Sequence, residues 1–187
     1  MYKKSAGLLM YRETAGQIEV FLVHPGGPFW AKKDERAWSI PKGEFSEDED
    51  PLEAAKREFR EETGFVAKGK IQPLDPLRQA SGKIIYAWII KGDVDARALK
   101  SNTFSLEWPR GSGKVAEFPE VDRAAWFTIK IARCKILKGQ IAFLDQLERT
   151  VVSGRITTRE TSTTSPGRTG AREVPQQGSL FDSDERT

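Results

Sequence analysis

The chain has 187 residues, of which 38% are hydrophobic and 30% charged, and its formal net charge at pH 7 is +3. This mixture is ordinary for a globular protein, and the length suits one domain with a sizeable core. No apolar run approaches the length of a membrane-spanning helix, and the first residues lack a signal-peptide pattern. Cys134 is the single cysteine, which excludes an internal disulfide, so we expect a cytoplasmic protein.

The first quarter of the chain is predicted to form strands. Residues 4–11 and 18–24 are apolar runs typical of β-strands. The loop that follows contains Phe29, Trp30 and Lys32. Aromatic rings beside cations could stack a nucleobase and bind phosphates, so Trp30 and Lys32 are candidate substrate contacts. Rings that only close the edge of the sheet would explain Phe29 and Trp30 equally well.

A short acidic helix with clear ends is predicted over residues 51–63, after a short strand at 38–41. Asp50 can cap its first turn and Glu53 can complete a capping box. Gly64 can supply the left-handed residue that ends a helix. The apolar residues of this helix fall on one stripe, which should face a core.

The same helix gathers three carboxylates on one surface. Glu58 and Glu62 are one helical turn apart, and Glu61 lies beside them. Like charges at this spacing repel, and they lie near the C-terminal end of the helix, where its dipole disfavours anions. A bound cation would remove this cost, and oxygen ligands without Cys or His suit Mg²⁺ or Mn²⁺. Arg57 precedes Glu61 by four residues and could hold its carboxylate in place.

These residues resemble the Nudix box, G-x5-E-x7-R-E-U-x-E-E-x-G-U. Gly43, Glu49 and the run Arg57–Phe65 match every fixed position of the pattern. The resemblance implies an α/β/α sandwich with a mixed central sheet flanked by helices, over a domain of residues 1–152.

The resemblance also implies roles for individual residues. Glu58, Glu61 and Glu62 would bind Mg²⁺, with Mn²⁺ as a possible substitute, and Glu58, Arg57 and Glu61 are the catalytic candidates. Arg57 would orient Glu61, while Glu49 and the turn at Gly43 would support the metal ligands. Lys42 is a candidate contact to a substrate phosphate.

Strands are further predicted at 66–72, 79–90 and 124–129, followed by an amphipathic helix over 131–152. Gly139 could interrupt this helix or start its main part. In the Nudix family, a carboxylate from a late loop often adds a metal ligand or acts as the base. The residues that compete for the role of general base here are Glu58, Glu107, Glu117 and Glu120. Spacing does not choose among them.

Residues 153–187 are rich in Ser, Thr, Gly, Pro and Arg, and we expect a disordered polar tail. Within it, residues 177–181 resemble the short peptides by which bacterial repair proteins bind the sliding clamp. Gln177, Leu180 and Phe181 would make that contact.

The predicted function is metal-dependent pyrophosphohydrolysis of a nucleoside diphosphate linked to another group. Trp38-x-x-Pro41-Lys42-Gly43 resembles the segment before the box in Nudix enzymes that cleave dinucleoside polyphosphates, which makes Trp38 a candidate substrate contact. Dinucleoside polyphosphates and nucleoside triphosphates therefore come first as substrates. ADP-ribose, oxidised dGTP and the 5′ end of RNA stay open, as does a non-catalytic nucleotide sensor.

Overall fold

Two long strands from the start of the chain lie at the centre of the sheet. The structure is a computed structural model that describes residues 3–162. Strand β1 (Lys4–Thr14) pairs antiparallel with β2 (Gln17–Pro25) across a tight turn. Both strands are buried over most of their length because their apolar runs are covered on both faces.

The main sheet is mixed, as the sequence predicted. Its other strands are β3 (Lys42–Glu44), β4 (Ile71–Pro73), β5 (Leu77–Arg78), β6 (Ile84–Lys91) and β9 (Val121–Thr128). The order is β4-β6-β1-β2-β9, with β3 paired to β1 and β5 paired to β6. Strands β1 and β6 run parallel, whereas the other pairs are antiparallel.

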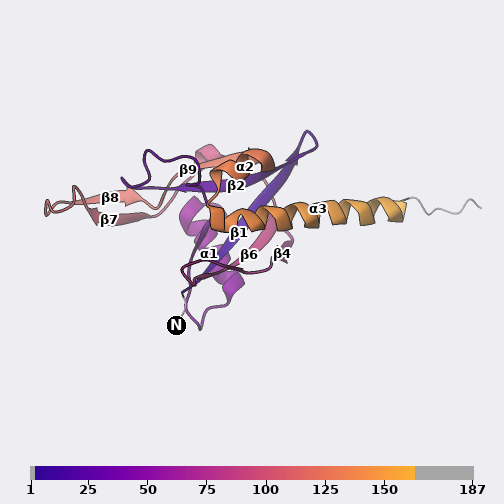
Figure 1. The fold of residues 1–187 in the computed structure, drawn as a ribbon, viewed down its shortest axis with the longest axis horizontal. Coiled ribbons are helices and arrows are strands. Elements are labelled where there is room, and N and C mark those ends of the chain that lie inside the picture. Colours follow the sequence, from indigo (N-terminus) through magenta and orange to yellow (C-terminus); the bar gives the residue numbers. More distant parts are fainter. Residues whose placement is uncertain (1–2, 163–187) are drawn as a thin grey trace, which may run out of the picture. The chain divides into compact units, whose positions relative to one another are not determined.

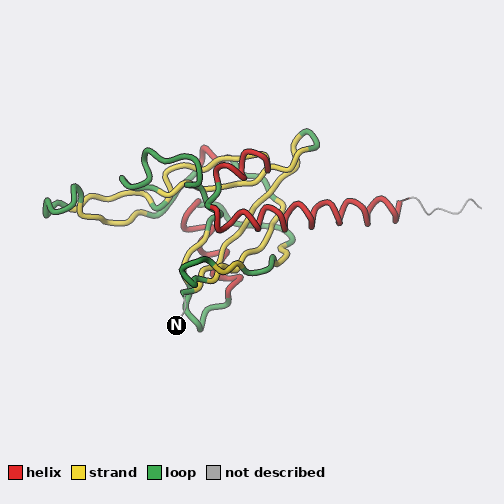
Figure 2. The backbone as a smooth tube through the Cα atoms, in the orientation of Figure 1, coloured by secondary structure: helices red, strands yellow, loops and turns green. Residues whose placement is uncertain are grey.

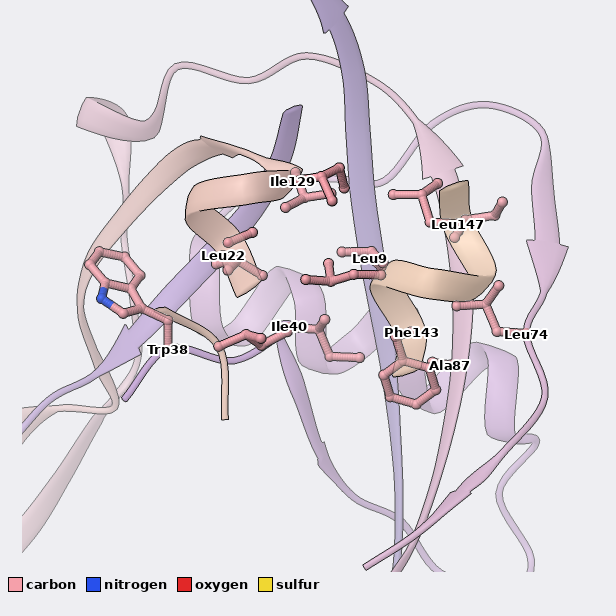
Figure 3. Close-up of a cluster of buried hydrophobic side chains, with 14 of the residues drawn as sticks. Leu9, Leu22, Trp38, Ile40, Leu74, Ala87, Ile129, Phe143 and Leu147 are labelled. Carbon is pink, nitrogen blue, oxygen red and sulfur yellow. The ribbon is translucent and has the colours of Figure 1, made fainter. Parts of the chain in front are cut away.

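Helices cover both faces of this sheet, which confirms the predicted α/β/α sandwich (Figure 1). They are α1 (Pro51–Thr63), α2 (Ile129–Lys135) and α3 (Ile141–Ser162), with short 3-10 turns η1 (Ala96–Ala98) and η2 (Lys138–Gln140). One core cluster joins Leu9 and Leu22 of the sheet to Ile129 of α2 and Phe143 of α3 (Figure 3). The other cluster lies between the opposite face and α1.

Helix α1 forms where its local signals predict it. The Asp50 side chain accepts hydrogen bonds from the Leu52 and Glu53 amides, and Gly64 ends the helix in the left-handed conformation. Phe59, on the apolar stripe, packs into the core with its ring fully buried. The centroid of this ring lies 6.2 Å from that of Phe21 on β2. Only half of the predicted capping box forms, because the Glu53 amide donates to Asp50 while the Glu53 carboxylate pairs with Lys56.

Several predicted strands are displaced. Residues 38–41 form only isolated bridges, and the strand before α1 is β3 instead. The strand predicted at 66–72 is limited to β4 at its end. The strand predicted at 79–90 begins only at Ile84, because residues 79–83 form the turn between β5 and β6. Gly139 does interrupt the last helical segment, as predicted, because it lies in η2 between α2 and α3.

A hairpin of β7 (Thr103–Glu107) and β8 (Val115–Pro119) was not predicted from the sequence. It forms a separate two-stranded sheet that extends away from the main sheet (Figure 2). Its strands alternate exposed and partly buried residues, and neither contains the continuous apolar run of β1 or β2.

The first compact unit of the chain ends at Val152, while α3 continues to Ser162 rather than ending at Val152. No helix in the described part of the chain is both long and apolar enough to cross a membrane. Most of the predicted tail, including Gln177, Leu180 and Phe181, lies outside the described residues, so its disorder and its sliding-clamp contact stay predictions.

Candidate functional site

The turn at Gly43 lies directly against the carboxylate of Glu58. Strand β3 pairs with the first half of β1, with Ala6 opposite Gly43, and this pairing holds the turn over α1. A Cβ placed on Gly43 would lie 1.9 Å from Glu58 Oε2 and 2.3 Å from Oε1. Any other residue at this position would place its Cβ where the carboxylate lies, which explains why the motif has glycine here.

A second carboxylate is fixed to the same turn. The backbone amide of Lys42 donates a hydrogen bond of 2.9 Å to Glu62 Oε2. Burial raises the pKa of Glu62 to about 7, against the opposing effect of Lys42. Burial likewise raises the pKa of Glu58, and it lowers the pKa of the Lys42 ammonium. The fold therefore holds two acids where their ionised forms are poorly solvated.

Arg57 connects three acids of the motif. Its Nε and Nη2 donate to the two oxygens of Glu49, at 2.8 and 3.1 Å. Its Nη1 donates to Glu58 Oε1 at 2.6 Å and to Glu61 Oε2 at 3.0 Å. The predicted ion pair of Arg57 with Glu61 is thus present. The two-point contact with Glu49 fixes the plane of the guanidinium, which in turn orients Glu58 and Glu61.

The structure distinguishes among the three late acids. The carboxylate of Glu107 accepts from the Gly113 amide, and that of Glu117 accepts from the Thr103 and Ser105 hydroxyls. Both contacts lie within the β7–β8 hairpin. Glu120 is different, because its charge adds to burial in raising the pKa of both Glu58 and Glu62.

Backbone hydrogen bonds hold Glu120 beside the end of α1. The Asn102 amide donates to the Glu61 carbonyl at 3.0 Å, and the Glu120 amide donates to the Asn102 carbonyl at 2.8 Å. Sequence reasoning missed Asn102. It acts through its backbone, so its side chain offered no signal that could have identified it.

The predicted substrate contacts do not all lie at this site. Trp38 belongs to the core (Figure 3) and is only 4% exposed. Its ring packs edge-to-face with those of His24 and Phe127. A ring buried in this way has little surface to offer a substrate. Trp30 packs partly against the core beneath the Lys33 ammonium, and Lys32 is exposed on the same loop. The structure does not bring these two residues together with the acids.

The acids fit a divalent cation by their chemistry rather than by their present arrangement. Within residues 3–162, no group of three His, Cys, Asp or Glu side chains already has a metal-binding arrangement. The oxygens of Glu58 and Glu61 contact Arg57 instead, and an oxygen of Glu62 contacts the Lys42 amide. The donor chemistry nevertheless fits, since the donors are carboxylate oxygens and burial leaves the charges of Glu58 and Glu62 poorly solvated. A cation would favour the ionised forms that burial disfavours.

Comparison with known proteins gives a consistent family. A family model described as the NUDIX domain matches residues 1–147. Over 66 residues, the chain is 40% identical to the bis(5′-nucleosyl)-tetraphosphatase (asymmetrical) of Caenorhabditis elegans, covering 35% of this chain and 44% of that protein. Over the same length it is 36% identical to an RNA pyrophosphohydrolase of Xanthomonas campestris, covering 35% of this chain and 27% of that protein. The aligned part thus spans less than half of either relative.

A solved structure is similar over a longer part of the chain. The crystal structure of a C. elegans Ap4A hydrolase binary complex has a TM-score of 0.54 at 24% sequence identity. The match covers 81% of this chain and 98% of that chain. At this identity, the similarity establishes the fold.

Proposed function

Because the chain belongs to the Nudix family, we propose that it is a metal-dependent pyrophosphohydrolase that cleaves a nucleoside diphosphate linked to another group. The observation that carries the proposal is the acid cluster at the Gly43 turn. Burial disfavours the charges of Glu58 and Glu62, while Arg57 holds Glu58 and Glu61 in fixed positions. An arrangement that costs stability without a cation is best explained by a need to bind one.

We propose that Glu58, Glu61 and Glu62 hold the cation, Mg²⁺ or in its place Mn²⁺. When bound, it would neutralise charge on the diphosphate and lower the pKa of a water molecule. Arg57, backed by Glu49, keeps the carboxylates oriented, and the Lys42 ammonium binds a phosphate oxygen.

Glu120 is the better candidate for the general base. One oxygen of Glu58 already accepts a hydrogen bond of 2.6 Å from Arg57, so that oxygen is not free to accept from a water molecule. Glu120 is exposed, and its carboxylate has no hydrogen-bond partner among the described residues. It can therefore take a proton from a water held near the acid cluster. Glu107 and Glu117 are engaged within the hairpin and are not proposed for this role.

Dinucleoside polyphosphates and nucleoside triphosphates are the proposed substrates. The segment Trp38–Gly43 and the name of the C. elegans relative support them. The name of the X. campestris relative supports the 5′ end of RNA as a second candidate, while ADP-ribose and oxidised dGTP are alternatives within the same chemistry. A non-catalytic nucleotide sensor is less favoured, because every carboxylate of the motif is present.

A substrate screen tests the proposal. The full chain is incubated with dinucleoside polyphosphates, nucleoside triphosphates, ADP-ribose and 5′-triphosphorylated RNA, with Mg²⁺ or Mn²⁺ and without metal, in ¹⁸O-labelled water. We expect cleavage of a phosphoanhydride bond only with metal, and ¹⁸O in one product by mass. Tight binding of a nucleotide without cleavage under either metal would favour the sensor instead.

A further inference from the structure

Two aromatic side chains from distant parts of the sequence meet on the surface beside the β7–β8 hairpin. Phe29 is 59% exposed and Trp108 is 37% exposed. Their ring centroids are 5.5 Å apart and their planes make an angle of 82°. In an edge-to-face pair, the ring that presents its edge keeps both of its faces out of the contact, so the pair itself does not prevent a planar group from stacking there. Single exposed apolar side chains are common, whereas exposed apolar side chains in contact with each other are typical of binding surfaces.

The backbone on both sides of the pair is fixed. At the tip of the hairpin, the Trp108 amide donates to the Lys114 carbonyl at 2.8 Å, and Glu107 holds the Gly113 amide at 2.7 Å. On the opposite loop, the ring of the buried His24 contacts the Lys33 carbonyl through Nε2 at 2.8 Å. The two rings are therefore presented in a preformed arrangement, which lowers the entropy cost of binding.

The surroundings of the pair are cationic. Lys32 follows Phe29 on the loop, and Arg110 and Lys114 flank Trp108 at the hairpin tip; all three are exposed. Among the described residues, none of these three cations has an acidic partner, whereas the hairpin acids Glu107 and Glu117 are already engaged. A surface that combines open ring faces with unpaired cations suits a base attached to phosphates better than an apolar protein segment.

The loop also connects this surface to the backbone at Glu120, the late acid whose charge acts on Glu58 and Glu62. The Gly26 amide donates to the Glu120 carbonyl at 2.9 Å. A Cβ on Gly26 would lie 2.0 Å from the Pro119 carbonyl oxygen, so only glycine allows the loop to pack this closely on the end of β8. Phe29 follows Gly26 by three residues, which places its backbone within about 10 Å of that contact.

We propose that Phe29 and Trp108 form the stacking surface for the second base of a dinucleoside polyphosphate, the base farther from the acid cluster. This inference rests on the proposed function and adds a specificity site to it. Lys32, Arg110 and Lys114 attract the phosphate chain toward the rings, and the ring faces hold the base without reading its identity. The site therefore favours substrates with two bases over substrates with one.

The test compares diadenosine tetraphosphate with adenosine 5′-tetraphosphate, which lacks the second base. For Phe29→Ala and Trp108→Ala, the ratio of kcat/KM between these two substrates should fall about tenfold, the loss of one stacked base. Trp108→Phe keeps a ring and should restore most of the ratio. Val115→Ala is the matched control, because it removes an apolar group that is 71% exposed on the same hairpin but outside the ring pair. Its ratio should equal that of the wild type.

Binding of methylene-bridged, uncleavable versions of both compounds, measured by calorimetry, separates this inference from the proposed function. Ring-dependent preference for the two-base analogue in a protein that cleaves neither substrate would refute the hydrolase and keep the stacking site. A protein that cleaves both substrates with the same ratio in wild type and ring variants would refute the stacking site. An equal loss on both substrates would also refute it, because the rings would then serve the shared part of the substrate.

Discussion

Replacing Glu62 with glutamine is expected to lower kcat by about two to three orders of magnitude, equivalent to roughly 3–4 kcal/mol of transition-state stabilisation. Glutamine keeps an oxygen that can accept from the Lys42 amide, so the turn over α1 should persist. It removes the negative charge that the proposed cation requires. Steady-state kinetics with Mg²⁺ at saturating substrate measure the effect, and thermal unfolding checks the fold.

The control for this variant is Glu53→Gln. Glu53 lies on the same helix, but among residues 3–162 its exposed carboxylate pairs with Lys56 alone. The same chemical change at this position should leave kcat within about twofold of the wild type, since exposed ion pairs contribute little. Near-normal turnover in Glu62→Gln would contradict the role given to the acid cluster.

Gly43→Ala should lower kcat about a hundredfold, because it displaces a group at the proposed reacting centre rather than removing it. The new methyl group would occupy the position of the Glu58 carboxylate. That carboxylate is the end of a flexible side chain, so it can rotate away, and the free energy of unfolding should change little. Activity falls because Glu58 then no longer lies beside the Lys42–Gly43 turn.

Gly139→Ala is the matched control for the added methyl group. A Cβ at Gly139 would meet nothing closer than 3.7 Å, an ordinary contact with the Gln79 side chain. This variant should keep wild-type kinetics. If Gly43→Ala also kept them, the close approach of Glu58 to Gly43 would have no importance for catalysis.

Local features of the sequence predicted α1 and its motif well. The cap at Asp50, the end at Gly64 and the pairing of Arg57 with Glu61 all depend on residues a few positions apart. The β7–β8 hairpin, and the preference for Glu120 as the proposed general base, could not be predicted from residues a few positions apart. They depend on the backbone bonds that link Glu61, Asn102 and Glu120, and spacing along the chain does not reveal such contacts.

Trp38 illustrates a different failure. The sequence associated it with the substrate because it stands in a motif next to Lys42 and Gly43. Its indole is instead buried, donates to Asp34 and packs against Phe127. A buried residue of the core can stand next in sequence to residues of the site. A motif alone therefore does not separate residues that pack in the core from residues that contact the substrate.

Calorimetric titration of the full chain with Mn²⁺, in the presence of an uncleavable dinucleoside tetraphosphate, tests the central claim most directly. We expect saturable uptake by the wild type and a loss of at least about tenfold in affinity in Glu62→Gln, with the affinity of Glu53→Gln unchanged. Absence of uptake by the wild type, or equal affinity in the wild type and Glu62→Gln, would contradict that claim.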